Sequence, residues 1–432
     1  MKVAVLAHGS RGDIQPMLAV GDELKRRGHK VRLTVNLSSA RWAARAGLDI
    51  IPMRPDVEAF LKSPQGREML ANGRLVAFLR ELARQEAEDN GDLTRACREA
   101  CEGADLILST VLTGYRGATL ERVLDVPHLG LCTMPIVNTS HFASYLSPIR
   151  DLRVGWMNRL SWQAHIALYW MGQKGILNEA RRSAGLPDWD ARPRLEDGPV
   201  IGVFSKHLAP IPEDSPAGHW QGGHPTPSTE LRDRLGEGTL PPGLDAWLER
   251  GPAPVFFGFG SMPVQDPAAL MVTVKRLCKR HSVRALIGSG WTEYAQGDLP
   301  DDIFVAPAFD HDRVLPRCLA AVHHGGAGTT HASLRAGLPT LVCSIFGDQP
   351  FWGFRTARLG VGTTFPFQQW SEARVSAALE LLLRPETKER AQKIGRALRA
   401  ERGTEQVAEL IERFAREQGV SVMPVAAQAN VA

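Results

Sequence analysis

The sequence contains a group of residues suited to binding an anion between positions 322 and 330. This stretch is Val-His-His-Gly-Gly-Ala-Gly-Thr-Thr, and the run Phe-Gly-Asp-Gln-Pro follows at 346–350. Gly325, Gly326 and Gly328 lack the Cβ atoms that would keep a ligand away from the backbone. If a helix begins at this turn, its unpaired N–H groups and the positive end of its dipole face the ligand. The pattern therefore predicts a site for a phosphate or a diphosphate.

Two elements must position that glycine turn. The apolar run 319–322 predicts a buried parallel strand before it, and residues 329–336 predict a helix with a hydroxyl cap after it. No lysine follows as in a Walker loop, and the G-x-G-x-x-G spacing is missing, which disfavours an ATPase loop and a dinucleotide site. The plain alternative is that the glycines only form a tight corner.

The residues around this turn resemble the nucleotide-sugar signature of the GT-B glycosyltransferases of family 1. The match runs over 304–353 and includes His-His-Gly-Gly-Ala-Gly-Thr-Thr, Arg-Ala-Gly-Leu-Pro-Thr and Gly-Asp-Gln-Pro-Phe-Trp-Gly. Within that family it is most similar to the sterol glucosyltransferases and to bacterial transferases that act on antibiotics and lipids. The resemblance implies an α/β chain of GT-B fold, in which two doubly wound Rossmann-like domains face each other across a cleft. It also implies inverting transfer of a sugar, most often glucose, from a UDP-sugar to a hydroxyl group.

The resemblance assigns the sugar-nucleotide donor to the second domain. His324 matches the histidine that touches the diphosphate, and Asp348 and Gln349 match the acid–amide pair that binds sugar hydroxyls. Further contacts to the phosphates or the sugar are expected from Gly326, Ala327, Gly328, Thr329, Ser261 and Ser10. A carboxylate beside an amide suits a vicinal diol, although the pair could also be a solvated turn. His323 is expected to be structural, because neighbouring strand residues point to opposite faces.

Trp291 and Phe309 are the candidates for binding the base and ribose of the donor. Relatives hold uracil at the matching places, and an aromatic face suits a pyrimidine, but either ring could equally belong to the core. The glutamate that grips the ribose in plant members of the family is Ala332 here. A thymidine-linked deoxysugar, such as rhamnose, carried to a lipid or an antibiotic therefore stays open as the alternative donor.

Asp13 is the candidate catalytic base. Inversion by one in-line attack needs a base near the acceptor hydroxyl and charge stabilisation at the departing diphosphate. The run Gly-Ser-Arg-Gly-Asp at 9–13 resembles the antibiotic and sterol branches, which carry aspartate where plant relatives carry histidine. A carboxylate with a pKa of about 4 is a weak base and needs partial desolvation. The alternatives are that Asp13 only shapes the turn before a helix, or that His8 is the base.

Two short acidic motifs raise the question of a metal. Asp310-His311-Asp312 and Asp188-Trp189-Asp190 both spell D-x-D, which binds a divalent ion in glycosyltransferases of another fold. A helix terminus and His324 already supply positive charge for the diphosphate, and such short motifs recur by chance. We expect no metal and no cofactor, with the sugar nucleotide acting as donor substrate.

The order of the predicted elements indicates two α/β halves. Strands at 2–7 and 31–35, with a helix from about 17 to 27 between them, form a first β–α–β unit. Further strands are expected at 106–109, 128–132 and 200–204, and the charged stretch 74–101 is expected to be surface helix, interrupted near Asn90. A strand at 254–262, a helix at 267–280 and a strand at 284–287 begin a second unit.

These elements define the domains that we expect. Residues 1–222 form an N-terminal acceptor-binding domain, and the stretch 223–245, rich in glycine and proline, is an interdomain linker. Residues 246–405 form a C-terminal nucleotide-sugar domain. Residues 406–432 contain a final helix, which in the family packs back on the first domain, and a tail.

Composition excludes several other classes of protein. The 432 residues are 44% apolar and 23% charged with a formal charge of +4, and the basic residues are interleaved with acidic ones, which disfavours nucleic-acid binding. The six cysteines show no zinc spacing, and residues 1–7 are too short for a signal peptide, so a cytoplasmic protein is expected. No apolar run reaches the roughly 18 residues that span a membrane.

The acceptor is expected to be a lipophilic alcohol such as a sterol, a polyketide or a lipid. Six aromatic residues crowd positions 142–170, and the run 160–173 is uncharged if His165 is neutral. This segment could wall an acceptor pocket, lie on a membrane surface as a peripheral contact, or simply pack onto the sheet. Two other classes stay open, namely an epimerase or hydrolase of sugar nucleotides and a non-catalytic protein that binds them.

Overall fold

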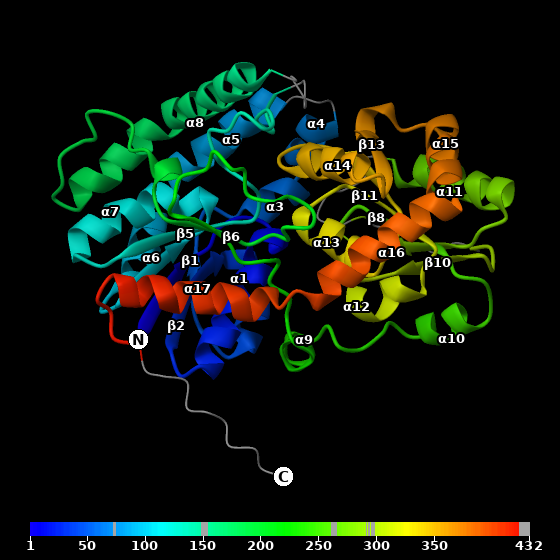
Figure 1. The fold of residues 1–432 in the computed structure, drawn as a ribbon, viewed down its shortest axis with the longest axis horizontal. Helices are drawn as coiled ribbons and strands as arrows, with labels where there is room; N and C mark the ends of the chain where they lie inside the picture. The colour runs from blue at the N-terminus through cyan, green and yellow to red at the C-terminus, as the bar shows by residue number, and fades with distance from the viewer. Residues whose placement is uncertain are drawn as a thin grey trace, which may run out of the picture.

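The computed structural model describes residues 1–71, 75–147, 154–260, 266–290, 292, 294 and 299–422. These residues form two α/β halves that lie side by side, each built on one parallel sheet (Figure 1). The GT-B architecture of two doubly wound domains, expected from the sequence, is confirmed.

The N-terminal sheet has seven strands in the order β3-β2-β1-β4-β5-β6-β7. Their bounds are β1 Lys2–Leu6, β2 Lys30–Asn36, β3 Asp49–Met53, β4 Leu106–Ser109, β5 His128–Cys132, β6 Val200–Gly202 and β7 His219–Gln221. Each neighbouring pair is parallel, so all strands end at the same edge. The segment after β1 therefore opens at the edge where ligands bind in such sheets.

The C-terminal sheet has six strands in the order β10-β9-β8-β11-β12-β13. Their bounds are β8 Val255–Gly258, β9 Ala285–Gly288, β10 Ile303–Ala306, β11 Ala320–His323, β12 Thr340–Ser344 and β13 Gly362–Pro366. The pairs in this sheet are parallel as well. The anion-binding turn follows β11, an inner strand that is fully buried.

Seventeen α-helices connect or cover these strands in the described part of the chain. They are α1 Arg11–Arg26, α2 Leu37–Ala43, α3 Val57–Lys62, α4 Pro64–Ala71, α5 Leu75–Glu88, α6 Asn90–Cys101, α7 Gly114–Leu124, α8 Gly155–Ser183, α9 Thr229–Leu235, α10 Leu244–Glu249, α11 Pro267–His281, α12 His311–Val314, α13 Ala327–Arg335, α14 Gln349–Arg358, α15 Glu372–Leu382, α16 Pro385–Ala400 and α17 Gly403–Glu417. The predicted helical stretch 74–101 is confirmed as α5 and α6, which meet at Asn90.

The predicted strands are confirmed, but five further strands were not predicted. β4 and β5 have the predicted bounds, whereas β3, β7, β10, β12 and β13 were not expected. β3 contains Pro52, which is tolerated because an edge strand needs hydrogen bonds on one side only. β7 has three residues, too few to show a periodic pattern.

The chain passes between the halves twice. The glycine- and proline-rich stretch expected to be a linker contains the short helix α9, whose Leu231 and Leu235 join the apolar core of the N-terminal half. Near the C-terminus the chain returns through α17, which lies beside α1 across the N-terminal half (Figure 1). Val407, Ile411 and Phe414 of α17 are buried in that same core.

Apolar contacts also join the two halves directly. Phe346, just after β12, lies 5.3 Å between ring centroids from Phe78 of the N-terminal half. Phe351 of α14 lies 5.3 Å from Phe142. The turns that follow β1 and β11 thus belong to two halves held against each other.

Candidate active site

The N-terminus of α13 is an open helix end. Gly326 is its N-cap residue and no side chain caps it, so the predicted hydroxyl cap is wrong. The helix begins at Ala327 rather than at Thr329, and the Thr330 hydroxyl instead donates backward to the Gly326 carbonyl (3.0 Å). Because Gly326 has no side chain to cap the first turn, the N–H groups of residues 327–329 can serve as donors for an anion, and that of Ala327 also acts on the Asp348 carboxyl, whose pKa it lowers.

His324 lies directly against this helix end. A Cβ atom added to Gly326 would come within 2.6 Å of the His324 Nε2 atom, so glycine is what lets the ring approach the turn. Burial lowers the pKa of His324 to about 4, and the ring is therefore neutral near pH 7. Its Nδ1 atom is buried and makes no hydrogen bond in the described structure. A Cβ atom added to Gly260 would come within 3.4 Å of Nδ1, so this nitrogen faces the turn after β8 and Nε2 faces the start of α13.

His323 serves the turn itself. Its side chain is fully buried, and its Nδ1 atom accepts a hydrogen bond from the Gly325 backbone N–H (3.0 Å). The two histidines thus point to different sides of the strand, as the alternation of strand residues predicts.

Asp348 and Gln349 lie at the start of α14, and hydrogen bonds from neighbouring residues fix both side chains. The indole N–H of Trp352 donates to Asp348 Oδ2 (2.7 Å). Burial and, to a smaller extent, the negative charge of Asp13 raise the pKa of Asp348 to about 7, while the hydrogen bond from Trp352 opposes the rise. The Gln349 Oε1 atom accepts from the N–H groups of Ile345 (2.8 Å) and Phe346 (3.2 Å), which leaves its amide N–H groups as the part that can donate to a ligand.

Asp13 sits on the first turn of α1. The helix begins at Arg11, several residues before the predicted start, and Ser10 is its N-cap residue. The backbone N–H and the hydroxyl of Ser10 both donate to Asp13 Oδ2, at 2.8 and 3.0 Å. Burial raises the pKa of Asp13, while these two hydrogen bonds oppose the rise. A desolvated carboxylate held by one oxygen is a stronger base than a free one.

Gly9 makes this geometry possible. Its φ of +130° is unfavourable for other residues, and a Cβ atom there would lie 2.4 Å from Asp13 Oδ2. The glycine thus provides the room in which the carboxylate sits beside the end of β1.

The structure brings the predicted base and the predicted sugar-binding acid into one region. Asp13 comes from the N-terminal half and Asp348 from the C-terminal half, yet the charge of Asp13 acts on the pKa of Asp348. Asp348 in turn acts on the phenol of Tyr145, whose pKa is raised mainly by burial. Side chains from both halves are therefore close enough for their charges to interact.

Other predicted residues are placed differently. Ser261 and Trp291 lie outside the described residues, and Ser10 is engaged with Asp13. The ring of Phe309 is only 9% exposed and packs in the core against Phe256 (5.9 Å between centroids). Ala332, at the position of the plant glutamate, is buried in the same core.

The acidic motif at 310–312 is engaged with arginines. Asp310 pairs with Arg232 (3.2 Å) and caps the short helix α12 through the Asp312 N–H group. Asp312 pairs with Arg232 (2.5 Å) and with Arg335. In the second motif, Asp188 pairs with Arg182 at 2.8 Å. The carboxylates of Asp188, Asp310 and Asp312 therefore form ion pairs with arginines within the protein.

The aromatic segment divides into an inner and an outer set. Phe142, Trp162 and Trp170 are buried, whereas Trp156 is 67% exposed. Burial lowers the pKa of His165 to about 4, so the run 160–173 is uncharged near neutral pH. His165 packs against Tyr145 (4.4 Å between centroids), which places part of α8 beside the candidate site.

Sequence reasoning missed the residues that support the site from behind. Trp352 stands four residues after Asp348, a spacing that places both on one helix face and could have indicated the contact. His331, one turn after Ala327, hydrogen-bonds the Ala327 carbonyl (2.7 Å) and accepts from the Ser205 N–H of the other half (3.1 Å). No sequence signal links His331 to Ser205.

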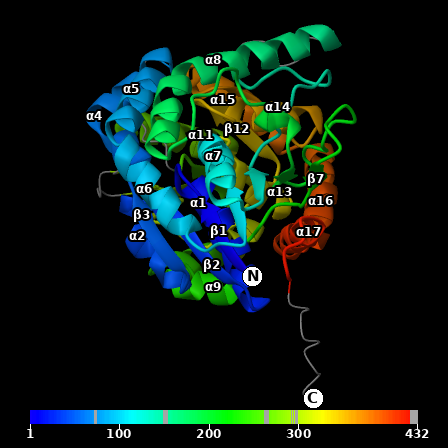
Figure 2. The same cartoon turned by 90° about the vertical axis from the view of Figure 1, so that its left-hand side faces the viewer.

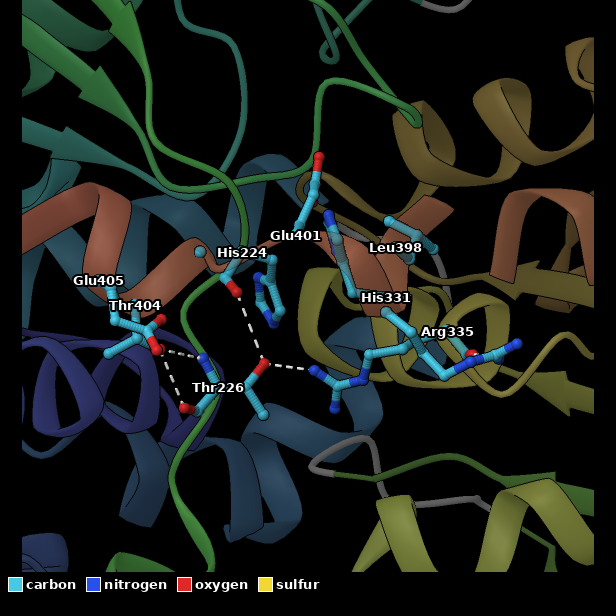
Figure 3. A pocket seen from close by; sticks show the side chains of 10 residues that line it. His224, Thr226, His331, Arg335, Leu398, Glu401, Thr404 and Glu405 are labelled. Atoms are coloured by element: carbon cyan, nitrogen blue, oxygen red, sulfur yellow. Dashed lines mark hydrogen bonds between the residues drawn. The ribbon is translucent and has the colours of Figure 1, made fainter. Parts of the chain in front are cut away.

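A cavity of about 200 Å³ is lined by His331 and Arg335 of α13 together with residues of both chain crossings (Figure 3). The imidazole of His224 stacks on that of His331 there, with centroids 4.1 Å apart. Thr226 bonds Arg335 of α13 and Thr404 of α17. Both chain crossings between the halves thus meet beside α13.

Two family models match the chain. The C-terminal domain of erythromycin biosynthesis protein CIII-like proteins matches residues 292–413, and the N-terminal domain of glycosyltransferase family 28 matches residues 3–88. The two matches cover the open end of α13 and Asp13, respectively.

Curated proteins of similar sequence include glycosyltransferases. The sterol 3-beta-glucosyltransferase UGT80A2 of Arabidopsis thaliana is 30% identical over 423 residues, which are 93% of this chain and 64% of that protein. An uncharacterized glycosyltransferase of Mycobacterium leprae is 31% identical over 429 residues, which are 95% of this chain and 96% of that protein. The chain thus spans under two thirds of the plant relative and nearly all of the mycobacterial one.

Solved structures of glycosyltransferases have the same fold. CalG4, the calicheamicin glycosyltransferase, has a TM-score of 0.68 at 19% identity, covering 96% of this chain and 98% of that one. The spinosyn rhamnosyltransferase SpnG, complexed with thymidine diphosphate, has a TM-score of 0.63 at 19% identity, covering 96% and 100%. At these identities the likeness establishes the fold.

Proposed function

Because the chain belongs to the GT-B glycosyltransferases of family 1, we propose that it transfers a sugar from a UDP-sugar to a hydroxyl of a lipophilic acceptor. Glucose is the proposed sugar, since the sterol glucosyltransferase UGT80A2 is among the similar proteins. The observation that carries the proposal is the pairing of an α13 terminus with no N-cap side chain beside His324 and a partly buried Asp13 from the other half.

The proposed reaction is a single in-line displacement with inversion. The acceptor oxygen forms a bond to the anomeric carbon as the bond from that carbon to the diphosphate breaks, and the electron pair leaves with the diphosphate. Asp13 takes the proton of the acceptor hydroxyl. The amides at the start of α13 and a hydrogen bond from neutral His324 stabilise the charge on the leaving group.

Asp348 and Gln349 are proposed to orient the sugar. The Trp352 indole fixes the carboxyl group of Asp348, and two backbone N–H groups fix the amide of Gln349. Side chains held in this way lose little freedom when they bind hydroxyl groups, which favours a near-attack geometry.

The donor base remains a choice between uracil and thymine. Ala332 replaces the ribose-binding glutamate of plant relatives, and the related SpnG is complexed with thymidine diphosphate. A thymidine-linked deoxysugar is therefore the second candidate donor. We propose that the base binds near Phe309 and Trp291, the two aromatic residues that the sequence offers for this role.

The proposed acceptor is a lipophilic alcohol that is supplied from a peripheral membrane contact. In support, the ring of Tyr145 packs against Trp162 and His165 on the inner face of α8, and the charge of Asp348 acts on its phenol.

All six cysteines are free, which agrees with the proposed cytoplasmic location. Among the described residues, none of the helices combines the length and apolar character needed to span a bilayer.

A panel of donors and acceptors tests this function. UDP-glucose and thymidine-linked sugars are each incubated with a sterol, a polyketide alcohol or a simple sugar, and nucleoside-diphosphate release is measured with and without EDTA. We expect release that requires a lipophilic acceptor and survives EDTA. Release without any acceptor would instead indicate a hydrolase or an epimerase, and binding without release would indicate a non-catalytic protein.

A further inference from the structure

Helix α8 carries a continuous apolar stripe on its outward face. Four of the eight exposed large apolar side chains in the described structure belong to it, namely Trp156 (67%), Leu160 (55%), Leu168 (56%) and Met171 (69%). Together with the exposed Ala164, they follow one another at intervals of three or four residues. That spacing places them along one side of a helix over about 22 Å, at a rise of 1.5 Å per residue.

This stripe is distinct from the face that α8 packs against the protein. Trp162, Ile166 and Trp170 point inward and are at least nine-tenths buried. A helix that covers the surface of a protein normally has one apolar and one polar face, whereas a helix that is apolar on both sides is covered on both. The outer face of α8 therefore indicates a contact that the isolated chain leaves unmade.

The charges of α8 indicate what covers the stripe. From residue 155 to residue 178 the helix has no Asp or Glu, and its two charged residues are Arg159 and Lys174. Arg159 reaches back to Asp214 (2.8 Å), and Lys174 is exposed. Apolar side chains flanked by cations, with a tryptophan near one end, are typical of a helix that lies in the interface of a lipid layer.

The position of α8 is suited to a flat partner. The helix lies along the outer edge of the molecule in both Figure 1 and Figure 2, with its axis running along that edge. A broad surface can therefore touch several turns of α8 at once.

We infer that the outer face of α8 docks this protein onto a lipid bilayer, with the stripe from Trp156 to Met171 buried in the headgroup region. The opposite face of the same helix carries His165, which packs against Tyr145 beside the candidate site. Docking would thus place the acceptor side of the cleft near the membrane. This last consequence rests on the proposed lipophilic acceptor, but the docking itself does not.

Vesicle binding of the full chain, measured without donor or acceptor, tests the inference. Co-sedimentation with phosphatidylcholine vesicles, with and without phosphatidylglycerol, is compared for the wild type and the triple variant Leu160→Gln, Leu168→Gln, Met171→Gln. The matched control is the double variant Leu37→Gln, Val272→Gln, which changes exposed apolar residues on α2 and α11. The control should bind as the wild type does, and the triple variant should lose at least about tenfold in partitioning.

Three readouts keep the inference separate from the proposed reaction. Binding by the wild type should strengthen with phosphatidylglycerol and weaken with added salt. The triple variant should keep its melting temperature and its transfer rate toward a lipophilic acceptor dissolved in detergent without vesicles. Equal vesicle binding by the wild type and the triple variant would overturn the inference. It would also be overturned if the wild type were a dimer in solution and the triple substitution only made it a monomer. A protein that binds vesicles but transfers no sugar would overturn only the proposed function.

Discussion

Helices α1 and α13 follow inner strands of their parallel sheets, but their first turns are completed in opposite ways. In α1 the third residue is Asp13, whose Oδ2 atom accepts hydrogen bonds from the backbone N–H and the hydroxyl of the N-cap residue Ser10. In α13 the third residue is Thr329, the N-cap residue is Gly326, and no side chain caps the turn. One helix end is closed by its own acid, and the other is left open.

In the proposed mechanism, the N-termini of α1 and α13 therefore have opposite tasks. A closed end holds a carboxylate at the positive pole of a helix dipole, where burial can still raise its pKa enough to make it a useful base. An open end has amides to offer to an anion that arrives from outside. The same strand–turn–helix unit can thus serve as base or as anion site, depending on one side chain.

Removing the acid from the closed end should have the largest effect. We expect Asp13→Asn to lower the rate of transfer by about a thousandfold, because a base typically contributes 10²–10⁴-fold. Donor affinity should change by less than about twofold, since the donor binds the other half. Steady-state kinetics and calorimetric titration with UDP measure the two quantities. Normal turnover by Asp13→Asn would show that the base is elsewhere.

Closing the open end should have the next largest effect. Thr329→Asp places a carboxylate at the third position of α13, as in α1, where it would compete with the diphosphate for the amides. We expect UDP affinity to fall by about a hundredfold. Thr329→Asn, which has the same shape without the charge, is the control and should lose far less. If both variants bind UDP equally well, the diphosphate does not use this helix end.

The imidazole beside the open end should matter less than its amides. His324→Ala removes one neutral hydrogen-bond donor, so we expect about a tenfold loss in UDP affinity and a larger loss in transfer. Because burial keeps the pKa of His324 near 4, UDP affinity should not weaken as pH rises from 5.5 to 7.5 on account of this residue. A clear loss over that range, absent in His324→Ala, would show that the ring binds as a cation.

The smallest effect concerns the acid that faces Asp13. The pKa of Asp348 is raised to about 7 in the folded protein, so between about pH 4 and pH 7 the native state binds more protons than the unfolded state. Stability should therefore fall as pH rises through this window. Asp348→Asn should flatten that slope and melt a few degrees higher than the wild type at pH 8. Parallel melting curves at every pH would contradict the raised pKa.

The contrast between the two helix ends was only partly predictable from sequence. The glycines and histidines at 323–328 indicate the anion site. The start of α13 at Ala327 was not predicted, because its N-cap residue is Gly326 and not a residue with a side-chain hydroxyl. The capping of Asp13 by Ser10 follows a local spacing of three residues and was foreseeable as a turn. The effect of Asp13 on Asp348 joins residues more than 300 positions apart and needed the structure.

The aromatic segment shows the same limit. The sequence shows six aromatic residues between positions 142 and 170, but it does not tell Trp162, which is 1% exposed, from Trp156, which is 67% exposed. That choice depends on which side of α8 the rest of the fold covers. The edge strands β3 and β7 likewise form because a neighbouring strand offers them hydrogen bonds, a cause that their own residues do not reveal.

A crystal structure of the protein with bound UDP is the most direct test of the central claim. The account predicts that the β-phosphate lies within about 3 Å of the backbone nitrogens at the start of α13 and accepts a hydrogen bond from His324. It also predicts that Asp13 faces the diphosphate across the cleft between the halves. A diphosphate bound anywhere else, for example in the cavity lined by His224 and Arg335, would contradict it.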